Sequence, residues 1–192
     1  MDRERILQIL KDSEAFMTGH FLLTSGRHSN AYVQCAKVLR HPQYAEEILR
    51  YVAAQCKELD IDLIVGPAMG GVIVSYELGR QIKKEAIFTE RVDKEMELRR
   101  GFQIGEGARV LIAEDVITTG KSTLETKKVI ESYSGKVVGA ACMVNRLGKG
   151  IQLGLPIFSA IELEIETYEP DTCPICKKGS VGLVKPGSRR MK

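Results

Sequence analysis

Two adjacent acids follow a short apolar run near the middle of the chain. Residues 110–113 form the run, and Glu114 and Asp115 come directly after it. A run of this kind is typical of a buried parallel strand, and open α/β sheets bind ligands beyond the carboxyl ends of their strands. We therefore expect both carboxylates to lie at a ligand-binding edge, where they can accept hydrogen bonds from sugar hydroxyls.

The chain continues from the acids into a turn of small polar residues, which leads into an expected helix over 124–134. The free N–H groups and the dipole of a helix N-terminus bind anions, so the turn predicts a phosphate site. It does not match the P-loop, because that motif needs a glycine five residues before its last glycine, and Asp115 stands there. A phosphate site beside paired acids suits a phosphorylated sugar. The expected binding residues are Glu114, Asp115, Val116, Ile117, Thr118, Thr119, Gly120, Lys121 and Ser122.

The same segment resembles the PRPP-binding motif of the type I phosphoribosyltransferases, in which an apolar strand, two acids and two apolar residues precede Thr-Thr-Gly. The resemblance implies 5-phosphoribosyl 1-diphosphate (PRPP) as cosubstrate. It implies Mg²⁺ as cofactor, with the ion held by the substrate and by no protein side chain. It also implies that Glu114 and Asp115 take part in catalysis, because they would hold the ribose while positive charge builds on it.

A second glycine-rich turn, over 66–71, follows an expected strand and precedes an expected helix. The plain interpretation is a turn that caps this helix. Its place at a strand end favours instead a set of N–H groups that approach a diphosphate, and the turn resembles the pyrophosphate loop of the same family. Some orotate enzymes carry Lys where this chain has Gly70, so we expect Gly70 to bind PRPP through main-chain groups only.

Basic and acidic residues alternate over 90–101, between two expected core strands. One interpretation is a solvated helix with pairs such as Glu95 and Arg99; the other is a mobile lid. The stretch resembles the family's catalytic loop, whose basic residues reach the pyrophosphate, often in a neighbouring subunit. The resemblance implies catalytic and PRPP-binding roles for Arg91 and Lys94, PRPP binding by Arg99, and a homodimer that shares this loop. The family's loop often carries a His, which this chain lacks here.

Residues 21–32 bear on the choice of base. On chemistry alone they are a polar turn that leads into a strand, but they resemble the N-terminal hood of orotate phosphoribosyltransferases, which covers the base. Many family members have Lys where this chain has Thr24, so Arg27 or a backbone N–H would contact the orotate carboxylate instead. Arg146 follows an expected strand over 136–144, and a guanidinium suits a planar, carboxylate-bearing pyrimidine. The residues expected to bind orotate are Ser25, Gly26, Arg27, Tyr32, Thr118 and Arg146.

Cys173 and Cys176 form one C-x-x-C in a tail rich in Pro, Cys, Gly and Lys. One such pair supplies half of the four ligands of a structural zinc site, and the histidines at 20, 28 and 41 are distant in sequence. A structural metal, free thiols and a surface disulfide therefore all stay open. A cysteine pair with a Lys-Pro-Gly-Ser-Arg tail, here at 185–189, resembles one branch of the orotate enzymes.

The 192 residues, 44% of them hydrophobic, fit one α/β domain. Helices expected over 3–14, 42–57, 72–83 and 124–134 alternate with strands expected over 61–65, 86–89, 110–113, 136–144 and 157–163. This alternation predicts a mainly parallel, twisted sheet flanked by helices. With the resemblance, we expect the type I phosphoribosyltransferase fold over 1–168, with a small N-terminal hood, and a Cys-containing appendage over 169–192.

Bulk properties exclude some partners. The net charge of +3 is too weak to indicate nucleic-acid binding, and no apolar run is long enough to cross a membrane. The first residues show no signal pattern, so we expect a cytoplasmic protein. Cys35, Cys56 and Cys142 stand in apolar surroundings and are expected to be buried free thiols.

The resemblances extend from residue 21 to residue 189 and imply an orotate phosphoribosyltransferase activity. Such an enzyme transfers the phosphoribosyl group of PRPP to orotate and yields orotidine 5′-monophosphate and pyrophosphate in pyrimidine biosynthesis. One alternative is a phosphoribosyltransferase for another base, such as a purine. The other is a PRPP-sensing regulator on the same fold, which would need a DNA-binding module for which the short N-terminal helix leaves no room.

Overall fold

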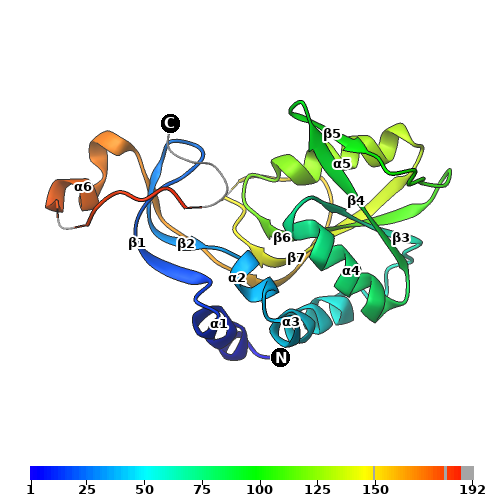
Figure 1. The fold of residues 1–192 in the computed structure, drawn as a ribbon, viewed down its shortest axis with the longest axis horizontal. Helices are drawn as coiled ribbons and strands as arrows, with labels where there is room; N and C mark the ends of the chain where they lie inside the picture. Colours follow the sequence, from blue (N-terminus) through cyan, green and yellow to red (C-terminus); the bar gives the residue numbers. More distant parts are fainter. Residues whose placement is uncertain (149, 180, 187–192) are drawn as a thin grey trace.

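The computed structural model describes residues 1–148, 150–179 and 181–186. Within these residues the chain forms a larger sheet of six strands covered by helices, and a smaller sheet of three strands to one side of it (Figure 1). No helix in the described ranges combines the length and the apolar character that a membrane crossing requires.

The larger sheet has the strand order β5-β4-β3-β6-β7-β8. All neighbouring strands are parallel except β4 and β5, which form an antiparallel hairpin. This arrangement confirms the α/β fold with a mainly parallel sheet. The strand bounds are β3 Leu63–Pro67, β4 Glu85–Val92, β5 Glu95–Leu98, β6 Arg109–Ile117, β7 Lys136–Asn145 and β8 Ile157–Glu162.

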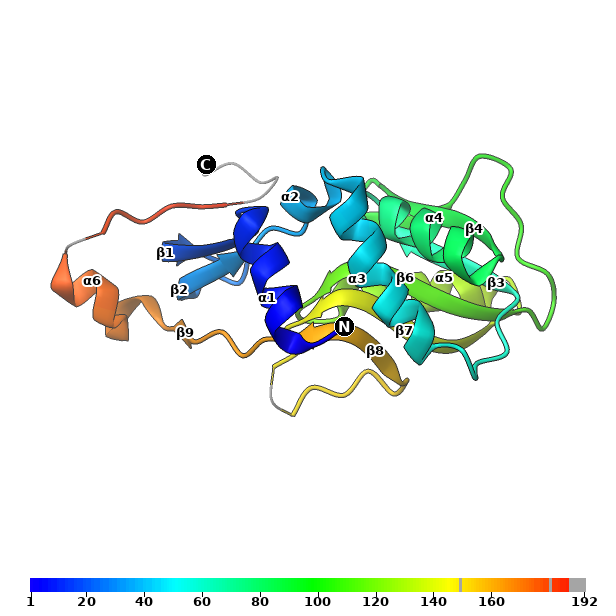
Figure 2. The ribbon, with the colours of Figure 1, turned by 90° about the horizontal axis from the view of Figure 1, so that it is seen from below.

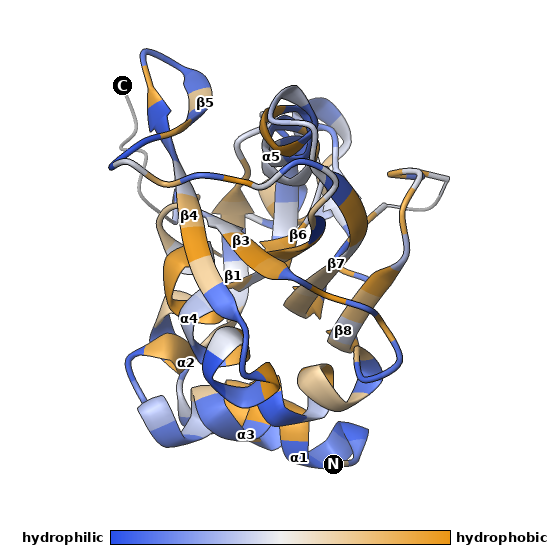
Figure 3. Cartoon of the chain, turned by 90° about the vertical axis from the view of Figure 1, so that its right-hand side faces the viewer, coloured by the Kyte–Doolittle hydropathy of each residue, from blue (hydrophilic) through white to orange (hydrophobic). Residues whose placement is uncertain are grey.

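Helices cover both faces of this sheet, as the alternation of side chains along β6 requires. Leu111 and Ala113 join the core that the first helices and α4 cover, whereas Val110 and Ile112 join a second core that includes Ile130 of α5. Figure 3 shows the core strands as mainly hydrophobic and the β4–β5 hairpin beyond them as largely hydrophilic. The helix bounds are α1 Arg3–Asp12, α2 Ala36–Leu39, α3 Pro42–Gln55, α4 Gly70–Ile82 and α5 Lys121–Ser132.

The smaller sheet, which we call the hood, has the order β1-β2-β9, with β1 at Phe16–Leu22, β2 at His28–Val33 and β9 at Thr167–Tyr168. The chain after β9 forms a 3₁₀ turn, Pro170–Thr172, and a short helix α6, Pro174–Lys178, and then returns along β1. Figure 2 shows the hood and this tail at one end of the molecule and the larger sheet at the other. The division of the chain at residue 168 stays a prediction.

The expected elements form with ends shifted by a few residues, and the structure also contains elements that were not expected. The charged stretch 90–101 is not a helix, because Arg91 and Val92 pair with Met96 and Glu95 across the β4–β5 hairpin. The strands β1 and β9 and the short helices α2 and α6 were not expected. The predicted buried thiols Cys35, Cys56 and Cys142 are confirmed as free and buried. The tail motif from residue 187 lies outside the described residues.

Candidate active site

The two acids of β6 lie near its carboxyl end and point to opposite faces of the sheet, as successive strand residues must. Glu114 turns towards α5, where the hydroxyl of Thr123 donates to its Oε1 at 3.5 Å. Burial and the neighbouring charge of Asp115 raise the pKa of Glu114 to about 8, although hydrogen bonds from Thr123 and Ser122 oppose this. Glu114 is therefore a buried carboxyl group whose ionised form the surroundings disfavour.

Asp115 turns to the other face and lies against the glycine turn that opens α4. A Cβ at Gly70 would overlap the carboxylate of Asp115, and one at Gly71 would lie 2.7 Å from the carbonyl oxygen of Ala113. Both positions therefore need glycine for the turn to lie this close to β6. The turn also contains a cis peptide bond between Ala68 and Met69. Burial raises the pKa of Asp115, against hydrogen bonds from backbone N–H groups that lower it. The structure thus brings the predicted acid and the predicted diphosphate turn together.

The expected phosphate turn connects β6 to α5. Gly120 is the N-cap of α5 and has φ of +71°, and a Cβ there would overlap the side chain of Leu153. Thr118 and Thr119 are exposed at the turn, and the N–H of Lys121 donates to Oγ1 of Thr119 at 3.4 Å. The turn therefore offers hydroxyls and the N-terminus of α5 to a ligand. Val116 and Ile117 are the last residues of the strand. Lys121 and Ser122 open the helix, and Lys121 pairs with Glu125 at 3.8 Å.

Arg146 follows β7 and lies beside the acidic strand end. Its backbone N–H donates to the carbonyl of Ile117 at 2.8 Å, which fixes it next to the phosphate turn. Its guanidinium is largely buried, and its Nε has no hydrogen-bond partner among the described residues. Burial lowers the pKa of Arg146. A buried guanidinium with an open donor is costly unless a ligand satisfies it.

Tyr32 of the hood approaches the same point. Burial raises the pKa of its phenol, and the charges of Arg146 and Asp115 act on it in opposite directions. Cys35, just after β2, donates from Sγ to the backbone carbonyl of Asp115 at 3.4 Å. The end of β2 therefore lies over the carboxyl end of β6, with Tyr32 close to Asp115 and Arg146. Their roles in binding stay predictions.

The other predicted hood residues lie elsewhere. Ser25, Gly26 and Arg27 form the β1–β2 turn, at the opposite end of β2 from Tyr32, roughly 17 Å away at the rise of an extended strand. Arg27 forms an ion pair with Glu169 and donates to the side chain and the carbonyl of Thr167, both at 2.9 Å. Within this chain Arg27 therefore fastens β9 to the hood and does not meet Arg146.

The predicted lid is the β4–β5 hairpin. It follows the carboxyl end of β4, so it lies at the same end of the parallel strands as Glu114 and Asp115. Strand β3 separates β4 from β6. Arg91 forms an ion pair with Glu125 of α5 and donates to the backbone carbonyl of Lys94 at 2.5 Å. Lys94 and Arg99 are exposed. In this conformation Arg91 is engaged within its own chain, whereas the other two cations face solvent.

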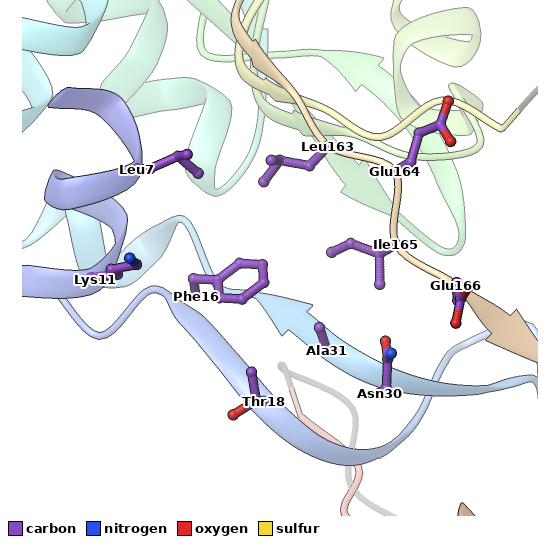
Figure 4. A pocket seen from close by; sticks show the side chains of 10 residues that line it. All are labelled: Leu7, Lys11, Phe16, Thr18, Asn30, Ala31, Leu163, Glu164, Ile165 and Glu166. Carbon is purple, nitrogen blue, oxygen red and sulfur yellow. The ribbon is translucent and has the colours of Figure 1, made fainter. Parts of the chain in front are cut away.

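A cavity of about 480 Å³ lies apart from this site, between α1, the hood and the link from β8 to β9 (Figure 4). Apolar side chains such as Leu7, Phe16 and Ile165 line much of it. Neither Glu114 nor Asp115 lines this cavity, and no residue of the phosphate turn does, so it is not the expected PRPP site.

The cysteine pair has neighbours that the sequence did not indicate. The histidines are distant in sequence, but in space His20 and His28 of the hood lie close to Cys173 and Cys176. About 150 residues of chain separate the two pairs, so no local spacing could reveal this cluster.

Comparison with known proteins gives two sequence findings. A profile described as the phosphoribosyl transferase domain matches residues 35–163. The orotate phosphoribosyltransferase of Caldicellulosiruptor saccharolyticus is 50% identical over 192 residues, which cover 100% of both chains. The profile match excludes the hood and the tail, whereas the similarity to the full-length relative includes them.

Solved structures share the fold. Orotate phosphoribosyltransferase from Aeropyrum pernix has a TM-score of 0.69 and 25% identity, covering 92% of this chain and 99% of its own. UMP synthase from Leishmania donovani has a TM-score of 0.72 and 22% identity; the match covers 83% of this chain and only 36% of that longer one. The second likeness supports the fold alone.

Proposed function

The chain belongs to the orotate phosphoribosyltransferase family, and we propose how its residues divide the reaction. The enzyme transfers the 5-phosphoribosyl group of PRPP to orotate and yields orotidine 5′-monophosphate and pyrophosphate, in pyrimidine biosynthesis. A ring nitrogen of orotate forms the new bond to the ribose C1 and gives up its proton to water, while the bond from C1 to pyrophosphate breaks and its electron pair leaves with the pyrophosphate. A cytoplasmic location stays a prediction.

PRPP would bind along the carboxyl end of β6. The 5′-phosphate suits the turn from Thr118 to Ser122, because exposed hydroxyls and the N-terminus of α5 meet there. Ribose hydroxyls would donate to Glu114 and Asp115. Because burial disfavours the ionised form of both acids, positive charge that develops on the ribose would stabilise these carboxylates most in the transition state.

Orotate would occupy the place between Tyr32 and Arg146. The observation that carries this assignment is the buried Nε of Arg146, which has no hydrogen-bond partner among the described residues. It lies at the end of β7, next to the acids of β6. The orotate carboxylate is a planar acceptor that a guanidinium can bind with two hydrogen bonds. Thr118 lies in the neighbouring turn, close enough in sequence to the phosphate site to contact both substrates. Roles for Ser25, Gly26 and Arg27 in orotate binding remain proposals.

The leaving pyrophosphate would lie on the glycine turn at Gly70. The site fits a Mg²⁺ that the substrate holds through its own oxygens, because the carboxylate of Asp115 lies beside that turn and favours a cation there. When bound, Mg²⁺ neutralises charge on the pyrophosphate. The chain's own part is to exclude water and to bring cations from the lid, because water would otherwise hydrolyse the activated sugar.

We propose a homodimer in which Lys94 and Arg99 serve the partner's site, whereas Arg91 holds the hairpin to α5 through Glu125. An apolar stripe supports an interface beside the lid. Met69, Ile73 and Tyr76 follow each other at helical spacing along α4, and their exposed fractions are 85%, 48% and 70%. A second copy would cover this stripe, which begins next to Gly70.

A panel of bases with PRPP and Mg²⁺ tests the function. We expect nucleotide formation to be fastest with orotate, and Asp115→Asn is the negative control. Faster formation from hypoxanthine or guanine would support the purine alternative instead. PRPP binding without turnover of any base would support the regulator.

A further inference from the structure

Four side chains from opposite ends of the sequence converge at the outer face of the hood. His20 comes from β1, His28 begins β2, and the C-x-x-C supplies the two thiols around α6. One ligand atom from each side chain lies within 4.8 Å of the other three. We propose that these four side chains, His20, His28, Cys173 and Cys176, bind one structural Zn²⁺ ion.

Four of the six separations between ligand atoms are close to the edges of a zinc tetrahedron. With Zn–N of about 2.05 Å and Zn–S of about 2.3 Å, ligand atoms should lie roughly 3.3 Å apart for N···N and roughly 3.5 Å apart for N···S. His20 Nε2 lies 3.0 Å from His28 Nδ1 and 3.6 Å from the sulfur of each cysteine. The sulfur of Cys176 lies 3.3 Å from His28 Nδ1.

The surroundings orient the ligands. His20 Nδ1 lies 3.2 Å from the carbonyl oxygen of Val181. An N–H at Nδ1 would donate to that oxygen and turn the lone pair of Nε2 towards the cluster, which is the usual outer-shell arrangement for a metal-binding histidine. Backbone N–H groups of Ile175 and Cys176 donate to the sulfur of Cys173. His20, His28 and Cys173 are each at least nine-tenths buried.

A hydrogen bond between the two imidazoles would explain their close approach without a metal. It would not explain why both sulfurs face the same point as the two nitrogens. Two thiolates balance the charge of one divalent ion, so the complete site is neutral and suits a buried place. The set of two sulfurs and two nitrogens favours zinc among the divalent metals, and the small span leaves space for one ion and not for an iron–sulfur cluster.

The position of the cluster points to a structural role. In Figure 1 the hood lies between α6 and the larger sheet, so the cluster is on the far side of the hood from the acids. A three-stranded sheet with a two-residue edge strand has little core of its own. The tail also pairs with β1, because Leu22 N–H donates to Val184 and Val184 N–H donates to His20. A metal would join this tail to the hood. It would bring together two segments that are far apart in sequence, and so stabilise the folded chain.

The test is metal analysis of the full-length enzyme purified without chelator, followed by zinc K-edge absorption spectroscopy. We expect one zinc per chain with two sulfur and two nitrogen neighbours. Cys176→Ser replaces an exposed side chain, so it should fold and lose about tenfold or more in zinc affinity. His20→Asn should do the same, whereas the matched control His41→Asn should keep the metal.

Cobalt substitution of the wild-type protein gives a second measurement if the variants fail to fold. Tetrahedral Co²⁺ with two thiolates should give intense visible bands and sulfur charge-transfer bands. Metal-free protein whose mass shows a Cys173–Cys176 disulfide, a bound iron, or zinc retained by both variants would each overturn the proposal. Because none of these readouts is activity, the result is independent of the proposed catalytic roles.

Discussion

At the scale of single residues, the site consists of charged groups that are buried before any substrate arrives. Glu114, Asp115 and Arg146 all have pKa values displaced by burial in the direction of the neutral form. Perturbed groups that gather at one strand end are typical of catalytic sites. These buried groups lower the stability of the free enzyme and bind substrate when it is present. Two variants can therefore separate their effect on stability from their effect on activity.

We expect Asp115→Asn to lower kcat/KM for PRPP by roughly 10- to 150-fold, the equivalent of about 1.5–3 kcal/mol for a charged hydrogen bond. The Tm of the free enzyme should stay the same or rise, because the variant removes a carboxylate whose ionised form burial disfavours. Steady-state kinetics and thermal melts measure both. Exposed Glu58→Gln is the control. Unchanged kcat/KM at matched Mg²⁺ would contradict the assignment.

The raised pKa of Glu114 predicts a pH dependence of stability. The folded protein keeps this proton up to about pH 8, whereas the unfolded chain loses it near pH 4.3. Between these values the unfolded state binds fewer protons, so the free energy of unfolding falls as pH rises. We expect Glu114→Gln to flatten that fall in substrate-free protein, measured as Tm against pH. Equal slopes for Glu114→Gln and wild type would show that Glu114 is already ionised in the free enzyme.

At the scale of elements, the sequence predicted what neighbouring strand ends must bring together. The β6 acids, the glycine turn after β3 and Arg146 after β7 meet because parallel strands end at one edge. The hairpin could not be predicted in the same way. Its charges suit a helix as well as a strand, and its turn uses positive φ at Asp93 and Lys94, with no glycine to mark it. The grouping of His20 and His28 with the two tail cysteines could not be predicted either, because these residues lie near opposite ends of the chain.

The turn from β6 to α5 gives a prediction about backbone geometry. Gly120→Ala should lower Tm by about 2–8 °C, because left-handed φ costs roughly 1–2 kcal/mol outside glycine and the new methyl overlaps Leu153. It should also raise KM for PRPP. Gly107→Ala is the matched control, since Gly107 has φ of +71° and no atom within 4 Å of its Cβ position. If both variants keep the wild-type KM, the turn does not hold the phosphate.

At the scale of the whole molecule, the catalytic parts lie unevenly around the larger sheet. Tyr32 of the hood, Arg146 and the two acids of β6 lie close together. The β4–β5 hairpin is at the other side of the sheet from β8. Arg91 is held by Glu125 of the same chain, and Lys94 faces solvent. The exposed stripe begins beside the glycine turn, and the helix α4 that carries it packs against the hairpin strand β4. A second copy on this face would cover apolar surface and bring a hairpin to each site.

Subunit mixing tests this arrangement. Chains with Lys94→Ala and chains with Asp115→Asn should each be nearly inactive as homodimers. If the hairpin acts on the partner, each heterodimer has one site with both an intact Asp115 and an intact Lys94. Random exchange makes half of the dimers mixed, so activity should recover to about a quarter of wild type. Two affinity tags verify the exchange, and Lys83→Ala in place of Lys94→Ala is the control. If exchange is complete and activity does not exceed that of either parent, the hairpin serves its own chain, because a site formed within one chain can regain nothing from a partner.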